Sequence, residues 1–275
     1  MTSSRLNTDC SGESRKRMGS LFRLRLTQAI LVFSWLSLVF WTPSAAERVE
    51  INTSLDFCTD YVWRGLVIND EPVLQPSFTA TQTIGRIGSF SFNIWGNFDF
   101  TDYYGTKNEF SEIDLTASYA LPSGPLGLEV GFIHYSFPST TDSATTEVYI
   151  TAGYELKDIP LAFSFSAFYD FDEIDGFYLS GKISSLILVT PQLSLELALS
   201  AGYADSDYNL GYFNVSDSSL VDSVASAALI YKISELFSLS VYGQYMSILD
   251  STLKDTIPIN SRDKLTGCLS LEFDF

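Results

Sequence analysis

Two residues with catalytic potential, His134 and Ser136, lie in a predicted strand spanning Leu126–Phe137. Because they are two positions apart on a strand, their side chains share one face, where a serine nucleophile and a histidine base could meet. Glu147, on the next predicted strand, could orient the histidine and complete a triad. Alternation of side chains, however, turns Glu147 to the polar face, whereas His134 follows the apolar series of Phe132. We therefore expect no catalytic site here.

Ionisable residues on the polar faces of the predicted strands form the largest candidate site. Acids outnumber bases nine to two among them, so a water-filled passage lined by this face would prefer cations. The alternative is a filled interior, in which the acids pair with Arg64 and Lys182 or contact trapped water. Arg64 is the best single candidate for a constriction charge, because it follows Asp56 and Asp60 near the end of the first strand. The predicted pore-lining residues are Asp56, Asp60, Arg64, Asp99, Asp114, Glu129, Glu147, Asp170, Lys182, Glu196 and Glu272.

The two cysteines beyond residue 46, Cys58 and Cys268, lie in the first and the last predicted strands. Both face the polar side, so a disulfide could join these strands if they pair in an oxidising compartment. A shift of one residue in either strand would exclude the bond and leave two free thiols. One histidine and two cysteines make no zinc-binding pattern, and the sequence has no glycine-rich phosphate loop. We predict neither a metal site nor a cofactor.

Regular alternation of apolar and polar residues predicts the strands that carry these side chains. In the final strand every second residue from Leu265 to Phe275 is apolar or glycine, and those between are polar or cysteine. About twelve such strands predict an all-β fold, a transmembrane antiparallel β-barrel with both termini on one side. The predicted strands are Val49–Arg64, Val73–Thr83, Ser89–Thr101, Glu112–Leu121, Leu126–Phe137, Thr146–Tyr154, Leu161–Phe171, Phe177–Ser184, Leu193–Tyr203, Val221–Tyr231, Phe237–Met246 and Lys264–Phe275.

Connections between the predicted strands alternate in length. Compact turns such as Pro122–Pro125 and Lys232–Leu236 alternate with longer polar loops such as Asp102–Phe110, Asp205–Leu220 and Ser247–Asp263. Outer-membrane barrels have short periplasmic turns and longer outer loops, so we expect both termini on the periplasmic side. A secreted β-sandwich would show the same alternation of faces, but the loop asymmetry and the small polar residues favour the barrel.

Residues 1–46 have the features of a secretory leader. Basic residues precede the apolar run Ala29–Trp41, and a Ser-Ala-Ala sequence then resembles a signal-peptidase site. The apolar run, about 13 residues long, is shorter than the roughly 20 residues that a spanning helix needs. Met18 is an alternative start, which would leave residues 1–17 upstream of the protein. The remaining chain, residues 47–275, is the expected barrel.

Charge and composition exclude several classes of function. The whole chain has a formal net charge of −17, and residues 47–275 carry 31 acidic against 10 basic side chains. Such acidity argues against nucleic-acid binding, which needs a basic surface. The 21 phenylalanines and 15 tyrosines argue against a disordered acidic polymer.

Two passages resemble motifs of a known family. The segment Asp60–Gln75 contains an aromatic-Arg-Gly motif followed by a proline and a glutamine, and Gly131–Pro138 followed by Glu147-Val-Tyr149 resembles a second motif. Together with the leader and the aromatic C-terminus, these features are similar to the TorF-like porins of proteobacteria. The resemblance implies an outer-membrane barrel with a pore and supplies no catalytic residues. The loop Asp205–Leu220 is longer than in the family pattern.

We therefore predict a porin-like channel in the outer membrane of a Gram-negative bacterium, which passes small solutes or ions and prefers cations. Outer-membrane lipid and lipopolysaccharide would surround it, and the barrel-assembly machinery would recognise the strand that ends in Phe275. One alternative is a non-conducting structural or adhesive barrel that acts through its outer loops. Another is an outer-membrane lipid hydrolase that uses His134 and Ser136.

Overall fold

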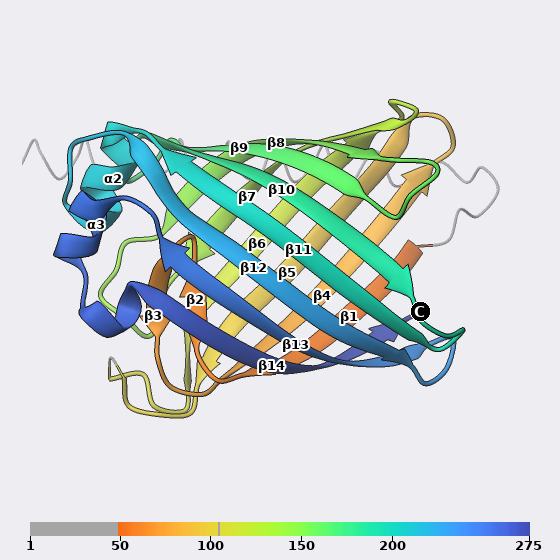
Figure 1. Ribbon diagram of the computed structural model, residues 1–275, viewed down its shortest axis with the longest axis horizontal. Coiled ribbons are helices and arrows are strands. Elements are labelled where there is room, and N and C mark those ends of the chain that lie inside the picture. Colours follow the sequence, from red (N-terminus) through yellow and green to blue (C-terminus); the bar gives the residue numbers. More distant parts are fainter. Residues whose placement is uncertain (1–48, 104) are drawn as a thin grey trace, which may run out of the picture. The chain divides into compact units, whose positions relative to one another are not determined.

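The strands of the computed structural model, which describes residues 49–103 and 105–275, close into a barrel of twelve strands (Figure 1). The predicted leader, 1–46, lies outside the described residues. The barrel strands are β1 (Val49–Cys58), β4 (Val73–Ile84), β5 (Gly88–Asp99), β6 (Glu109–Leu121), β7 (Leu126–Ser136), β8 (Thr145–Glu155), β9 (Ala162–Asp170), β10 (Gly176–Leu188), β11 (Leu193–Ala204), β12 (Ser219–Lys232), β13 (Phe237–Ile248) and β14 (Asp263–Asp274).

Neighbouring barrel strands are antiparallel and follow one another in chain order, and β1 pairs with β14 to close the barrel. Backbone hydrogen bonds join Ile51 to Phe275 in both directions, so the first and last strands meet at one end of the barrel. That end has the short turns, and we call it the terminus end. The longer connections gather at the other end, the loop end (Figure 1). The predicted antiparallel barrel is confirmed.

The outer face of the barrel is apolar along the middle of the strands. On β5, Phe92 and Ile94 are 42% and 40% exposed, and on β9 Phe163 and Phe165 are 41% and 53% exposed. On β9, Ser164 lies between these two phenylalanines and Ser166 follows them, and both serines turn inward. An apolar outside and a polar inside are the reverse of a soluble β-sandwich, and they match a barrel whose outer surface contacts lipid.

The first strand is shorter than predicted. It ends at Cys58 rather than Arg64, because the chain folds back into a separate hairpin of β2 (Tyr61–Trp63) and β3 (Leu66–Asn69). The two residues of its turn, Arg64 and Gly65, have φ of 43° and 85°, as two-residue hairpin turns of this hand require. Any side chain on Gly65 would be strained by this positive φ, and its Cβ atom would lie 2.7 Å from Ile248 Cδ1 and 3.0 Å from Asp222 Cβ, so the position strongly favours glycine.

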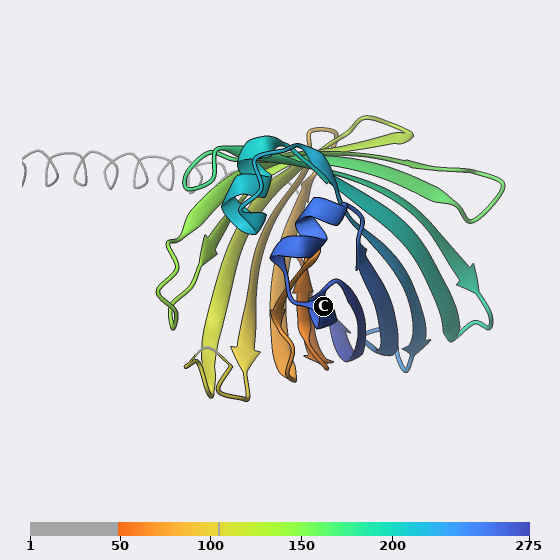
Figure 2. The same cartoon turned by 60° about the vertical axis from the view of Figure 1, so that its left-hand side comes forward.

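Two short helices lie at the loop end, where they can be seen in front of the barrel opening in Figure 2. Helix α2 (Ser206–Phe213) begins at Asp205, whose carboxylate accepts a hydrogen bond from the Tyr208 amide at 2.9 Å. Helix α3 (Ser251–Thr256) and the 3₁₀ turn η1 (Ile259–Ser261) lie between β13 and β14. The long loop predicted between β11 and β12 is therefore an ordered cap. None of the helices among the described residues has the length and hydrophobicity needed to span a membrane.

Buried apolar side chains from these helices and from the barrel wall form a core at the loop end. Tyr208 and Phe213 of α2 and Leu253 of α3 are almost fully buried against β12 and β13, and Trp63 and Leu66 of the hairpin pack on the same cluster. This side of the loop end is thus packed with apolar and aromatic side chains, whereas the alternation predicted a polar lumen throughout.

Candidate functional site

The tip of the β2–β3 hairpin crosses the lumen and places Arg64 against the opposite wall. Arg64 donates two hydrogen bonds to the carboxylate of Glu147 on β8, at 2.7 and 2.8 Å. Tyr135 on β7 donates to the same carboxylate at 2.9 Å. The side chains of Arg64 and Glu147 are only 9% and 1% exposed. Arg64 therefore forms an internal ion pair, the structural alternative to a free constriction charge.

Aromatic rings enclose the guanidinium of Arg64. Its central carbon lies 4.5 Å from the ring centre of Trp63, 4.2 Å from that of Phe168 and 4.6 Å from that of Tyr178. The ring of Tyr208 is 6.0 Å away, and burial raises the pKa of its hydroxyl, so a neutral phenol faces the cation. Cation–π contacts of this kind are strongest where water is excluded, so these rings hold the hairpin tip across the lumen.

Other predicted lumen acids near the loop end also have partners. Asp60 accepts a hydrogen bond from Thr266 and lies 3.8 Å from the ammonium group of Lys264. Asp99 accepts hydrogen bonds from two asparagines and a threonine, and Asp170 accepts them from a threonine and three backbone amides. These carboxylates fix the hairpin and the loops in position.

Predicted residues nearer the terminus end are more accessible. Lys182 and Glu196 are 3.8 Å apart, and their side chains are 45% and 40% exposed. Glu129 accepts a hydrogen bond from a tyrosine, Asp56 from a serine and Glu272 from an asparagine, but none of these three forms an ion pair within the described residues. This part of the lumen therefore carries carboxylates without basic partners.

Three cavities surround the hairpin. The first, about 460 Å³, lies at the loop end, and we call it the outer cavity because loop residues such as Thr140 and Glu173 line it. The second, about 570 Å³, lies on the other side of the hairpin tip and is lined by residues of the hairpin, of β5, β6 and β7, and of β9 to β13; we call it the inner cavity. A third, about 290 Å³, lies beside the seam of β1 and β14. Trp63 lines all three, so it forms part of the wall that divides the lumen.

Two buried lumen acids were missed by the sequence analysis, Glu112 and Asp222. Glu112 lines the outer cavity, whereas the predicted Asp114, two residues later on β6, lines the inner one. Glu112 is two positions before Asp114 on the same strand and so shares its inward face, which could have identified Glu112 from the sequence. Asp222 accepts a hydrogen bond from Tyr178 at 2.8 Å. Its position on β12 was obscured by neighbouring alanines and by a register irregularity against β11, which alternation does not reveal.

The proposed catalytic residues do not come together. His134 Nδ1 lies 3.0 Å from the hydroxyl of Thr146, and Ser136 donates to the carbonyl of Ile113 at 2.6 Å. Glu147 points to the other face of the sheet, where Arg64 and Tyr135 hold its carboxylate. A serine that donates to a backbone carbonyl rather than to histidine is not activated for attack, so this arrangement does not support hydrolysis.

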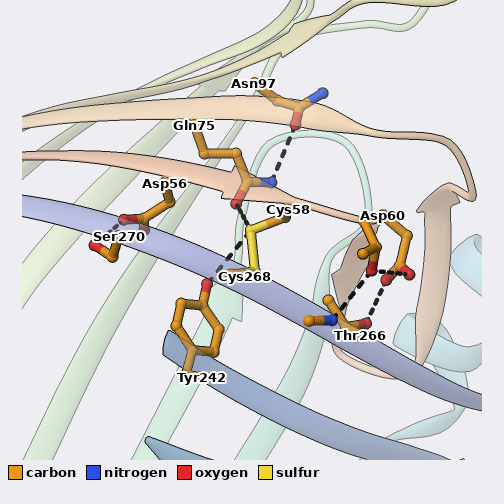
Figure 3. Close-up of a disulfide and its surroundings, with 11 residues drawn as sticks. Asp56, Cys58, Asp60, Gln75, Asn97, Tyr242, Thr266, Cys268 and Ser270 are labelled. Carbon is orange, nitrogen blue, oxygen red and sulfur yellow. Dashed lines mark hydrogen bonds between the residues drawn. A yellow bond between two sulfur atoms is a disulfide. The ribbon is translucent and has the colours of Figure 1, made fainter. Parts of the chain in front are cut away.

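A disulfide joins Cys58 of β1 to Cys268 of β14 at the seam that closes the barrel (Figure 3). The two residues are direct partners in the antiparallel ladder, with Cα atoms 4.1 Å apart. Both side chains are buried in the lumen, and the Tyr242 hydroxyl lies 3.5 Å from Cys58 Sγ. The register of the two strands places both cysteine side chains on the same face. A shift of one residue would have separated the sulfur atoms.

We expect the disulfide to be detectable on a denaturing gel. Without reductant, the unfolded and alkylated wild type should migrate faster than Cys58→Ser, and with reductant the two should migrate together, because the bond closes a loop between residues 210 positions apart. Loss of the bond should lower the free energy of unfolding by roughly 3–5 kcal/mol. Cys268→Ser is the matched control, and equal mobility of all forms without reductant would show that the bond is absent.

Comparison with known proteins identifies the family. The model of the family Gcw_chp, described as a bacterial protein of unknown function, matches residues 42–245. The chain belongs to this family. No curated protein is significantly similar to it in sequence.

Solved structures similar to this chain include outer-membrane porins and channels. The NanC porin has a TM-score of 0.50 and 9% identity, over 82% of this chain and 99% of that chain. An outer membrane channel from Pseudomonas putida F1 has a TM-score of 0.49 and 10% identity, over 85% of this chain and 99% of that chain. The KdgM porin has a TM-score of 0.47 and 13% identity, over 82% and 99%. At such identities the likeness to NanC shows a porin-like fold.

Proposed function

We propose that the protein is an outer-membrane channel of a Gram-negative bacterium, which passes small solutes or ions and prefers cations. The observation that carries this proposal is the closed barrel itself, apolar outside and hollow inside, with an inner cavity of about 570 Å³ lined by both polar and apolar residues. Twelve strands lie between the eight whose interior side chains can fill and the roughly 16 of open porins. A narrow passage is therefore the arrangement that this geometry favours.

The cation preference rests on the balance of charge in the lumen. Its two predicted bases, Arg64 and Lys182, each face a carboxylate. Glu129 and Glu272 have no basic partner within the described residues. Rings of uncompensated carboxylates favour cation entry because they lower the electrostatic energy of a cation in the passage.

The location and partners follow from the same proposal. The short turns and the termini would face the periplasm, and the loop end with α2 and α3 would face outward. Outer-membrane lipid and lipopolysaccharide would contact the apolar face, and the barrel-assembly machinery would recognise the strand that ends in Phe275. The TorF-like porins remain our proposal for the finer relationship, on the motifs at Asp60–Gln75 and Gly131–Pro138.

Recording in planar bilayers tests whether the lumen conducts. The purified protein in symmetrical potassium chloride should give discrete conductance steps, smaller than those of open porins because the hairpin narrows the lumen. Absence of steps with a correctly folded barrel, judged by a heat-dependent gel shift, would contradict the channel.

A non-conducting barrel is the second candidate, and the packed apolar cluster at the loop end favours it. The buried ion pair of Arg64 and Glu147, together with the packed helices, would then serve stability, and the loops would carry the function. Silence in the bilayer that persists after removal of the hairpin would support this candidate.

A further inference from the structure

The outer cavity combines aromatic walls with carboxylates. Trp63 stands at its inner wall, with the ring of Tyr135 6.0 Å away and that of Tyr212 5.3 Å away, both edge to face. The rings come from three elements, the hairpin, β7 and α2, so the tertiary fold assembles this wall. A volume of about 460 Å³ lies within the range of small-molecule sites.

Every charged side chain that lines the outer cavity is acidic. Asp142 and Glu173 are exposed on the loops at its mouth, whereas Asp99 and Glu112 are buried at its base. The Asp99 carboxylate already accepts hydrogen bonds from two asparagines and a threonine. Glu112, 6% exposed, has a tyrosine hydroxyl and the carboxyl of Asp114 as partners and forms no ion pair among the described residues.

The surroundings of Glu112 point to a missing positive charge. Because a hydrogen bond joins the carboxyl groups of Glu112 and Asp114, the two share one proton and together keep one buried negative charge, which is costly unless it is paired. Arg64 supplies a cation to Glu147 on the far side of Trp63, but no Lys or Arg lines the outer cavity. A bound cation at Glu112 would balance this charge.

From this geometry we infer that the outer cavity binds a small organic cation, an ammonium group on an apolar or aromatic body. The ammonium group would lie against the Glu112 carboxylate, and the body would contact the faces of Trp63, Tyr135 and Tyr212, which attract cations and bury apolar surface. Asp142 and Glu173 would attract the cation to the mouth and repel anions. Binding at this site does not require the lumen to conduct. Only the further step, that the bound cation is a solute that the channel passes, rests on the proposed function.

Calorimetric titration of the detergent-purified protein tests the site without requiring conduction. Benzylammonium should bind, whereas benzyl alcohol and phenylacetate, which match it in size but are neutral and anionic, should bind at least about tenfold more weakly. Equal binding of the three probes would overturn the inference, since micelle partitioning or a neutral pocket would then account for the heat.

Variants localise the binding. Glu112→Gln should weaken benzylammonium binding at least about tenfold, and Tyr212→Leu, which leaves the carboxylate intact, should weaken it severalfold. Glu196→Gln, which removes an accessible lumen acid outside the cavity, should have no effect. Unchanged affinity in both cavity variants would overturn the inference. Binding without bilayer current would contradict only the channel, and current without binding would contradict only this site.

Discussion

Replacing Arg64 with alanine should lower the free energy of unfolding by about 3–5 kcal/mol, because it leaves the Glu147 carboxylate buried without its cation. Two short hydrogen bonds and three rings within 4.6 Å of the guanidinium are lost together. Alanine keeps the left-handed backbone of position 64 at a similar cost, so the change reports on the side chain. Urea unfolding of the barrel in lipid vesicles, followed by gel shift, measures the loss.

A matched control compares the loss of this buried ion pair with the loss of an exposed one. Lys182→Ala breaks an ion pair that is 3.8 Å long and more than a third exposed on both sides, so it should cost at most about 1 kcal/mol. Combining Arg64→Ala with Glu147→Gln should recover part of the loss, because the buried charge is then removed as well. Equal effects of Arg64→Ala and Lys182→Ala would show that the ion pair at the hairpin tip is not a buried anchor.

Removing the whole β2–β3 hairpin should enlarge the passage more than any single substitution in it. If a short Gly-Ser turn replaces residues 61–69, the wall between the outer and inner cavities disappears, and conductance should rise roughly threefold or more. Trp63→Ala should give a smaller rise, because Trp63 lines both cavities while the rest of the hairpin remains. Single-channel recording in planar bilayers measures both changes.

An outward-facing substitution controls for general disturbance of the barrel. Leu199→Ala changes a side chain that is 56% exposed on the outer face of β11, so its conductance should equal that of the wild type. If the variant without the hairpin conducts no better than Leu199→Ala, the hairpin is not the constriction.

The barrel was predictable because its strands are long and each has one apolar face and one polar face. Alternation places Phe163 and Phe165 on one face and their serine neighbours on the other, and this pattern alone gave the strand number and the closing pair. The facing of Cys58 and Cys268 followed from the same parity, because strand pairing in a closed barrel leaves little freedom of register.

The hairpin was not predictable from alternation. The apolar residues of Tyr61–Trp63 continue the pattern of β1, so the segment resembled the rest of a long strand. Its inward turn depends on Arg64 and Gly65 adopting positive φ and on a carboxylate of β8, 83 residues away in sequence, accepting the guanidinium. Likewise, the outer cavity is built from the hairpin, β6, β7 and α2, and only their tertiary arrangement brings Glu112 beside Trp63 and Tyr212.

Ion selectivity tests the central claim most directly. With a tenfold gradient of potassium chloride across a bilayer, carboxylates without basic partners in the lumen should shift the reversal potential toward that of potassium, and Glu129→Gln should reduce the shift. A reversal potential of zero, or one displaced toward chloride, would contradict a lumen that selects cations.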